Sequence, residues 1–294
     1  MSRLKNDGFG KTLMYSFKLI GKTLMYSFKL IGKTLSPNYN VNEEKISKLP
    51  HGRFECFIIK DSLLLLCDIT VKSFSRIVFN ENSLDEDRLI WCGNYLAYID
   101  NLSKLSTVYS FGVSRNISFD EALVDKCGVK IYLFDPTSPA IEFMNSQPKN
   151  DSLVFESIGL WTETKRIKFF IDRNGGRIKN LSALNIFNTN EFMEADCKTL
   201  VDIMCEKKHH KIDLLKLDIE GAALPVLIQL FNKQDFLPKQ IIAELEIPRF
   251  VYGGTLKQVR DFFGDKRILF KKMKKAGYKI YTHGKAEFTA ILED

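Results

Sequence analysis

The sequence is poor in the residues from which metal centres and disulfide frameworks are built. It has only four histidines, and none of them has metal-ligand spacing to a cysteine or an acidic residue. Its six cysteines form no CxxC pair and no regular framework, so free thiols in a reducing compartment are the default expectation. We therefore predict no metal site and take the cytoplasm as the default location.

Beyond its first 35 residues, the chain has almost as many acidic as basic residues. The net charge of the 294 residues is +7, and residues 1–35 alone contain seven basic residues against one acidic residue. The rest of the chain is therefore nearly neutral, which argues against a broad nucleic-acid-binding surface. A small basic cluster at residues 271–275 predicts the exposed face of a helix that ends before Gly277.

The N-terminal segment contains an internal repeat. Residues 10–20 and 21–31 are identical copies of GKTLMYSFKLI, and residues 32–35 begin a third. Eleven residues is close to three helical turns, so the repeat predicts a helix with an apolar stripe opposite its lysines. Such a helix can make peripheral contact with an anionic membrane through residues 10–35, although its lysines exclude a transmembrane span. The alternative is a tandem duplication without a selected role, because each repeated glycine costs a helix about 1 kcal/mol.

Residues 108–135 have the order strand, glycine turn, helix, strand and acidic residue. The first four residues form a short apolar and aromatic run, typical of a strand buried on both faces, and Gly112 follows them. Residues 130–134 predict a second strand, which ends on Asp135. A carboxylate about 20 residues after a glycine turn is the usual arrangement for binding the hydroxyls of a ribose. The alternative is an ordinary βαβ unit, because a glycine near the first turn is common in such units.

Two helices are expected from their capping residues. Ser118 and Glu121 have the spacing of a capping box, so a helix should begin there and end near Gly128. Asp196 or Thr199 should cap a second helix, whose buried face carries apolar residues.

A second motif, IDLLKLDIEG, occupies residues 212–221. It begins as an apolar strand, and its end carries three charged residues, Lys216, Asp218 and Glu220. Because charge is costly inside an apolar core, this end should open onto a cleft. Parallel sheets bind ligands outside the carboxyl ends of their strands, so Asp135 and Asp218 should lie on the same edge. A solvated loop is the alternative interpretation.

The remaining elements can be placed coarsely. Residues 240–245 predict a parallel strand, and residues 279–283 and 287–292 predict a closing antiparallel hairpin around Gly284. The further strand predictions are residues 53–59, 63–71, 151–161, 167–171 and 184–187, and the last two add strand or hairpin structure around an Asn-Gly-Gly turn. Trp161 can stack on an adenine, although a tryptophan is more often a packing residue.

Four sequence blocks carry a family resemblance. They are YSFGVSRNISFDEAL, FDPT at residues 134–137, CKTLVDIM at residues 197–204 and IDLLKLDIEGAA. Together they resemble the FkbM-type branch of class I S-adenosylmethionine-dependent methyltransferases, and animal members are the most similar. The resemblance covers roughly residues 88–294. It implies an α/β fold with a doubly wound, mostly parallel seven-stranded sheet and an antiparallel C-terminal hairpin.

The resemblance also implies the cofactor and the site. S-adenosylmethionine would be bound with its methionine part beside Gly112 and its ribose on Asp135, while Asp218 would face the cleft shared by cofactor and substrate. Glu220 and Glu246 are the candidates for orienting the substrate or acting as general base. The full set predicted to bind the cofactor is Phe111, Gly112, Ser114, Asn116, Asp135, Pro136, Leu160 and Asp218. The acceptor would be a small molecule, a glycan or a peptide.

The chain departs from the family pattern at the glycine turn. Relatives carry a GxGGD-like turn, whereas this chain has GVSRN at residues 112–116, with one glycine and with Asn116 in place of an acid. The Ser114 and Arg115 side chains would crowd a cofactor or force a different loop path. Two functions therefore remain open, a methyltransferase or a catalytically degenerate methyltransferase fold that acts as a binding or scaffolding protein.

These observations predict three regions. With 45% hydrophobic residues, the chain can bury a full core. Residues 88–294 would form the methyltransferase domain, residues 36–87 an N-terminal cap, and residues 1–35 the basic amphipathic tail.

Overall fold

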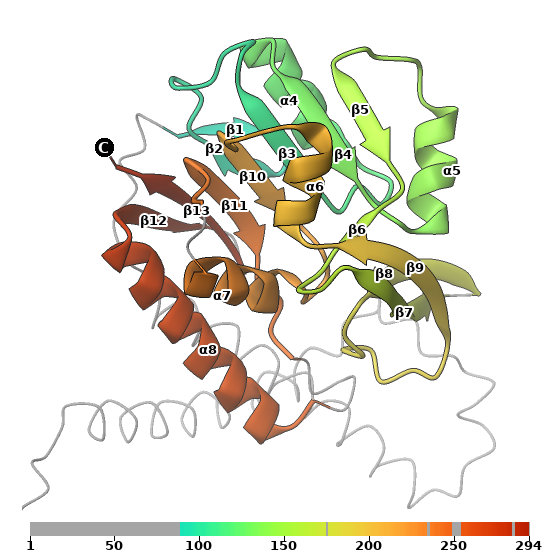
Figure 1. Ribbon diagram of the computed structural model, residues 1–294. Helices are drawn as coiled ribbons and strands as arrows, with labels where there is room; N and C mark the ends of the chain where they lie inside the picture. Colours follow the sequence, from blue (N-terminus) through green and yellow to red (C-terminus); the bar gives the residue numbers. More distant parts are fainter. Residues whose placement is uncertain (1–88, 175, 234–235, 249–253, 284–285, 294) are drawn as a thin grey trace, which may run out of the picture. The chain divides into compact units, whose positions relative to one another are not determined.

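The structure is a computed structural model that describes residues 89–174, 176–233, 236–248, 254–283 and 286–293 (Figure 1). The predicted tail of residues 1–35, the predicted cap of residues 36–87 and its strand-like pieces lie outside the described residues. None of the helices in the described part of the chain is long and apolar enough to cross a membrane.

A seven-stranded sheet forms the centre of the described fold, in the order β12-β13-β11-β10-β3-β4-β5. Its strands are β3 (Thr107–Phe111), β4 (Lys130–Phe134), β5 (Leu153–Glu156), β10 (Leu214–Leu217), β11 (Gln240–Glu244), β12 (Tyr278–His283) and β13 (Glu287–Leu292). Neighbours from β11 to β5 pair in parallel, whereas β13 runs antiparallel to both β11 and β12. The α/β class is confirmed, and the sheet is mixed. The predicted closing hairpin is β12 and β13.

Helices cover both faces of this sheet (Figure 1). They are α4 (Ser118–Cys127), α5 (Ser138–Ser146), α6 (Leu200–Lys207), α7 (Ala223–Lys233) and α8 (Leu256–Lys275). Leu123 of α4 packs in one buried cluster with Val108 and Ile131. Tyr109 points to the opposite face, where its ring lies 5.7 Å from that of His209, just after α6. The central strands β3 and β10 are covered on both faces and bury almost all of their residues, which explains their nearly continuous apolar runs in the sequence.

A second sheet of four strands follows β5 in the sequence. Its order is β6 (Gly159–Leu160), β9 (Phe192–Lys198), β7 (Lys165–Asn174) and β8 (Arg177–Ser182). The single strand predicted over residues 151–161 is therefore wrong, because β5 and β6 belong to different sheets. The strand predicted at residues 184–187 is also wrong, since the hairpin partner of β7 is β8. A separate two-stranded hairpin is formed by β1 (Ile90–Cys92) and β2 (Tyr95–Ala97).

The helix ends show which capping predictions hold. Gly128 ends α4 in the left-handed conformation, and the Thr199 side chain accepts a hydrogen bond from the backbone N–H of Asp202, so these two predictions are confirmed. The predicted capping box at Ser118 is wrong, because Ile117 occupies the N-cap position and its side chain makes no capping bond. The Asn116 side chain accepts the Ser118 N–H instead, at 3.0 Å.

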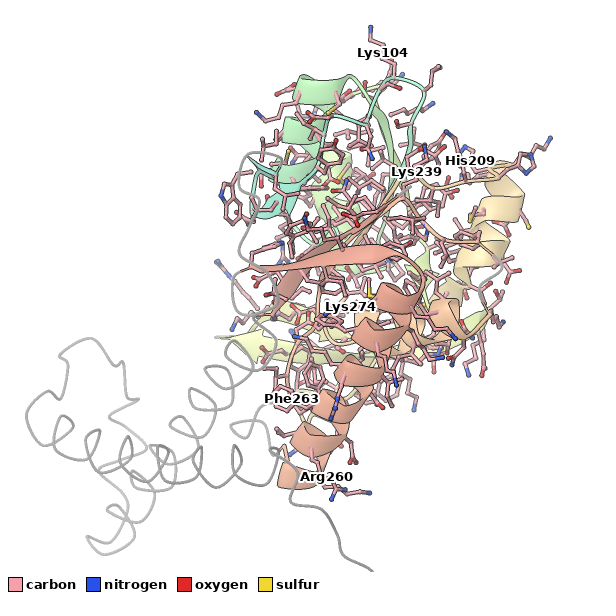
Figure 2. All side chains as sticks on the ribbon, turned by 90° about the vertical axis from the view of Figure 1, so that its left-hand side faces the viewer. Lys104, His209, Lys239, Arg260, Phe263 and Lys274 are labelled. Carbon is pink, nitrogen blue, oxygen red and sulfur yellow. The ribbon has the colours of Figure 1, made fainter. Side chains whose placement is uncertain are left out.

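The longest described helix, α8, carries the predicted basic cluster in its last turn. Figure 2 shows this helix with Arg260 near its beginning and Lys274 near its end. Lys271, Lys274 and Lys275 are exposed, as expected for a solvated face. The prediction of an exposed basic helix before Gly277 is confirmed.

Candidate functional site

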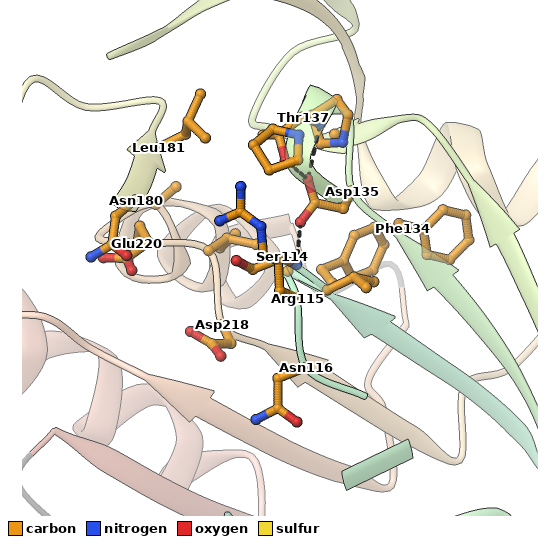
Figure 3. A pocket seen from close by; sticks show the side chains of 18 of the residues that line it. Ser114, Arg115, Asn116, Phe134, Asp135, Thr137, Asn180, Leu181, Asp218 and Glu220 are labelled. Atoms are coloured by element: carbon orange, nitrogen blue, oxygen red, sulfur yellow. Dashed lines mark hydrogen bonds between the residues drawn. The ribbon is translucent and has the colours of Figure 1, made fainter. Parts of the chain in front are cut away.

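A cavity of about 150 Å³ lies at the carboxyl ends of β3, β4 and β10 (Figure 3). The residues that follow these strands, Gly112, Asp135 and Asp218, all line it. The other predicted cofactor-binding residues in its lining are Phe111, Ser114, Asn116, Pro136 and Leu160. Glu220 also lines the cavity, whereas Glu246 lies outside its lining. The fold therefore brings residues from three distant sequence blocks together at one edge of the sheet.

Gly112 is required by the backbone of a neighbouring strand. Its φ is +87°, and a Cβ atom there would lie 1.6 Å from the backbone oxygen of Asp218. The Gly112 N–H donates to the backbone oxygen of Phe134 at 3.0 Å, and the Asp218 N–H donates to that of Phe111 at 3.0 Å. The close approach between the ends of β3 and β10 is thus sufficient to explain a glycine at this position, whether or not a ligand passes it.

Asp135 holds the glycine turn to the end of β4. Its Oδ2 accepts the backbone N–H of Ser114 at 2.9 Å, and its Oδ1 accepts the backbone N–H and the hydroxyl of Thr137 at 2.9 and 2.6 Å (Figure 3). The residue is only 6% exposed. Because a carboxylate has about four acceptor positions, these three donors leave room for one more.

The two side chains that replace glycines in the turn both line the cavity. Ser114 has a φ of +47°, which is uncommon for a residue with a side chain. The Arg115 guanidinium extends into the space between Asp135 and Asn180 (Figure 3). Its Nη1 donates to the backbone oxygen of Ile178 in β8, at 3.3 Å. The turn and the second sheet are therefore linked across the cavity by one long hydrogen bond.

Asp218 has two partners that sequence reasoning missed. Tyr95 donates its hydroxyl to Asp218 Oδ2 at 2.8 Å, and the Lys216 ammonium lies 3.6 Å from the same oxygen. Lys216 is 3% exposed and also donates to the backbone oxygen of Gly112 at 3.2 Å. Burial, followed by the Asp218 charge, raises the pKa of the Tyr95 phenol well above its usual range. Tyr95 therefore acts as a hydrogen-bond donor that fixes the carboxylate.

A buried acid lies on the α4 side of this group. Asp120 is 1% exposed, and burial raises its pKa while the Lys216 charge opposes the shift. The Ser110 side chain lies beside the Asp120 carboxyl and favours its charged form. Lys216 thus lies between two acids, Asp120 and Asp218, which offsets part of the cost of its own burial.

Glu246 belongs to a group of acids beside the cavity. Carboxylate oxygens of Asp218, Glu244 and Glu246 lie within 4.8 Å of one another, a grouping that sequence reasoning also missed. Glu246 Oε2 accepts the backbone N–H of Gly221 at 2.6 Å. Burial, then the charges of Glu244, Glu220 and Asp218, raise the pKa of Glu246 well above its usual value. Oxygen ligands of this kind suit a hard divalent cation, and exposed acidic groups are also common without one.

Glu220 is held at the cavity by its backbone. Its φ is +46°, and its backbone oxygen accepts the hydroxyl of Ser182 at the end of β8. Ser114 and Glu220 are thus two left-handed residues with side chains in one cavity, a kind of backbone strain that clusters at functional sites.

Trp161 is a packing residue. It lies against the buried cluster of Phe169, Ala195 and Cys197 between β7 and β9, and it is outside the lining of the cavity. The structure therefore favours the packing alternative for this tryptophan, and its stacking on an adenine stays a prediction.

The structure is an α/β domain with a cavity at the carboxyl ends of its parallel strands. The family model described as the methyltransferase FkbM domain matches residues 103–280. The chain therefore belongs to this methyltransferase family, which confirms the resemblance read from the sequence blocks. The likeness to animal members stays a prediction. Among curated proteins the chain has no match.

Several solved structures are similar to part of the chain. The FkbM methyltransferase from Methylobacillus flagellatus is 12% identical with a TM-score of 0.41, and the match covers 66% of this chain and 45% of that one. WbdD bound to a kinase inhibitor is 11% identical with a TM-score of 0.35, covering 63% and 35%. A complex that contains the Haloferax volcanii Trm112 methyltransferase activator gives 9% identity and a TM-score of 0.33, covering 66% and 85%.

Proposed function

We propose that this protein transfers a methyl group from S-adenosylmethionine to an oxygen or nitrogen atom of an acceptor, which is a small molecule, a glycan or a peptide. Membership of the methyltransferase FkbM domain family supports methyl transfer in general. We further propose that the large sheet is the doubly wound, mostly parallel Rossmann-like core of a methyltransferase domain over residues 88–294.

The observation that carries the proposal is the position of Asp135. This buried carboxylate lies at the end of the second parallel strand, lines the cavity and has one acceptor position left for a ribose hydroxyl. Phe111, Phe134 and Leu160 provide apolar lining suited to an adenine. When bound, S-adenosylmethionine supplies an activated methyl group on a positively charged sulfur. Asp218 on the cavity wall places negative charge beside such a ligand.

The acids beside the cavity suit proton removal from an acceptor. A general base works best with a pKa near the working pH, and the raised pKa of Glu246 is a shift in that direction. Glu220 lines the cavity and is the candidate for orienting the acceptor. Glu246, outside the lining, would act on an acceptor that enters from the side of Gly221, to which it is hydrogen-bonded.

A specific observation favours the alternative of a degenerate binding or scaffolding protein. The cavity of about 150 Å³ is smaller than the 300–1,000 Å³ of ordinary small-molecule sites, and the Arg115 guanidinium extends into it. S-adenosylmethionine therefore requires side chains to move, and within the described residues Arg115 is held by a single long hydrogen bond.

Calorimetric titration of the full chain with S-adenosylmethionine separates the two functions. The methyltransferase proposal predicts saturable binding that weakens about tenfold or more in Asp135→Asn, because a hydrogen bond to a charged acceptor contributes about 1.5–3 kcal/mol. Asp151→Asn, at an exposed acid that pairs with the equally exposed Lys149, is the matched control and should bind like the wild type. Since Asp135 also holds the turn, the variants are compared at a temperature where thermal unfolding shows both to be folded. Absence of binding to the wild type at millimolar cofactor would establish the degenerate alternative.

A further inference from the structure

We propose that Arg115 binds a carboxylate of the ligand in this cavity. This inference rests on the proposed function, under which the carboxylate belongs to the amino-acid end of S-adenosylmethionine. Arg115 would then determine specificity for a carboxylate-bearing cofactor, at a position where relatives carry a glycine.

The backbone of the turn leaves little to offer a carboxylate. The N–H groups of Gly112, Ser114 and Asn116 donate to Phe134, Asp135 and Val113, respectively. These bonds use three of the five N–H groups in residues 112–116 for holding the turn itself. A glycine-rich turn can present its backbone N–H groups to a ligand, so this chain needs a side-chain donor in their place.

Arg115 is such a donor and is available. A guanidinium has five N–H donors, and the single hydrogen bond of Arg115 within the described residues goes to the neutral backbone oxygen of Ile178. The described part of the chain contains no ion pair to Arg115. Two nearby acids are held by other groups, since Asp135 accepts from Ser114 and Thr137, and Asp218 accepts from Tyr95, and neither forms an ion pair with Arg115 within the described residues.

The lining contains charges of both signs, which suits the two charged ends of an amino acid. The acids Asp135, Asp218 and Glu220 line the cavity and favour an ammonium. The cations of the lining are Arg115, Lys179 and Lys216, and the last of these is committed to Gly112 and Asp218. A carboxylate therefore finds Arg115 on the turn and Lys179 on β8. Of these, only the planar guanidinium can bind it in a bidentate manner.

Binding requires the guanidinium to exchange partners. A bond of 3.3 Å to a neutral oxygen is weaker than a charge-assisted pair, so the exchange from Ile178 to the ligand is favourable. In the free protein the guanidinium lies in the space between Asp135 and Asn180 (Figure 3), so this exchange of partners has to clear that space for the nucleoside. Arg115 is thus an obstacle in the free protein and a partner in the complex.

The test compares S-adenosylmethionine with its decarboxylated form, which keeps the sulfonium and the amine. Both are titrated calorimetrically into the full-length wild type, Arg115→Ala, Arg115→Lys and Lys179→Ala. The wild type should bind the intact cofactor about tenfold or more tightly than the decarboxylated form. Arg115→Ala should lose this preference, with weaker binding of the intact cofactor and unchanged or tighter binding of the decarboxylated form. Arg115→Lys should retain part of the preference, and Lys179→Ala should retain all of it.

The possible failures can be told apart. If Arg115→Ala weakens both ligands equally, or keeps the wild-type ratio, the inference is overturned while the proposed function stands. Loss of the ratio in Lys179→Ala instead assigns the carboxylate to Lys179 and also overturns it. Absence of binding of either ligand to the wild type removes the proposed function and this inference with it. Thermal unfolding without ligand should be nearly unchanged in Arg115→Ala, because one long surface hydrogen bond is lost.

Discussion

At the scale of single residues, the cavity is shaped by positions where the backbone geometry restricts which residue can be accommodated. Gly112 is the strictest of them, because its missing side chain is what lets β3 and β10 end side by side. Asp135 and Asp218 follow on either side, and both carboxylates are held by hydrogen bonds from neighbouring segments. These hydrogen bonds fix the two carboxylates in place, whereas the Arg115 side chain on the same cavity has to move before a cofactor-sized ligand can enter.

Gly112→Ala should lower the free energy of unfolding by about 2 kcal/mol or more. The added Cβ atom would overlap the Asp218 backbone oxygen, and its left-handed φ costs a further 1–3 kcal/mol for a residue with a side chain. Gly176→Ala is the matched control, because φ there is +80° and no atom lies within 4 Å of the added Cβ. Urea unfolding of both variants separates the two effects. Equal losses would show that the overlap at Gly112 relaxes without cost and would contradict the prediction.

The buried Glu246 carboxyl should make the free energy of unfolding depend on pH. Because its pKa is raised above the ordinary 4.5, the folded protein keeps a proton there that the unfolded chain has lost. The free energy of unfolding should therefore fall as the pH rises from about 4.5 through the folded pKa of Glu246, and below pH 4.5 this group should not change it.

Glu246→Gln keeps an oxygen to accept the Gly221 N–H and should flatten this part of the curve. Denaturant unfolding between pH 4.5 and 8 measures it, with Glu293→Gln at an exposed position as the control. A variant curve parallel to that of the wild type would contradict the assignment.

At the scale of elements, local patterns predicted the strands that carry the site. The buried runs of β3, β4 and β10 are apolar because both faces are covered, so the sequence shows both the strands and the charged residues at their ends. The sequence also offered Thr199 as one of two candidate N-caps of α6. A hydroxyl residue directly before an apolar helix can accept a backbone N–H of the first turn, and this bond depends only on nearby residues. These features depend on residues that are close together in the chain.

Features that depend on distant residues could not be predicted. The chain from β5 to β6 reads as one strand, yet β5 pairs with β4 and β6 pairs with β9. Residues 184–187 have strand-like composition, but the Ser182 hydroxyl accepts the Leu184 N–H and turns the chain toward Gly221. The bond from Tyr95 to Asp218 joins residues 123 positions apart. Local hydrophobic periodicity carries no information about such pairings.

In the candidate site, too, some features could be predicted from the sequence and others appear only in the three-dimensional structure. Asp135 and Asp218 could be assigned to one sheet edge from the topology of parallel strands alone. That Asp135 already binds Ser114 and Thr137 follows from the three-dimensional path of the turn. The crowding expected from Ser114 and Arg115 concerns side-chain volume, and only the fold shows that Arg115 extends to β8.

At the scale of the whole molecule, charge is distributed unevenly along the chain. Residues 1–35 contribute a net charge of +6 to the total of +7, so the remainder is nearly neutral. The N-terminal segment lies outside the described residues, and its amphipathic repeat stays a prediction from the sequence. If the repeat binds membranes, the methyltransferase-family domain would be recruited by electrostatic attraction, which is sensitive to salt and to the lipid charge.

Flotation with lipid vesicles tests this recruitment. The full chain should float with vesicles that contain anionic lipid and much less with neutral vesicles, because each lysine near an anionic surface contributes about 1 kcal/mol. Deletion of residues 1–35 should abolish flotation, and added salt should weaken it.

A matched variant keeps the apolar stripe and removes the charge by changing five lysines to glutamine, namely Lys11, Lys18, Lys22, Lys29 and Lys33. Loss of flotation in this variant assigns the binding to electrostatics, and retention assigns it to the apolar stripe. Equal flotation of the full and the shortened chain would rule out the membrane role and leave the tandem duplication as the explanation of the repeat.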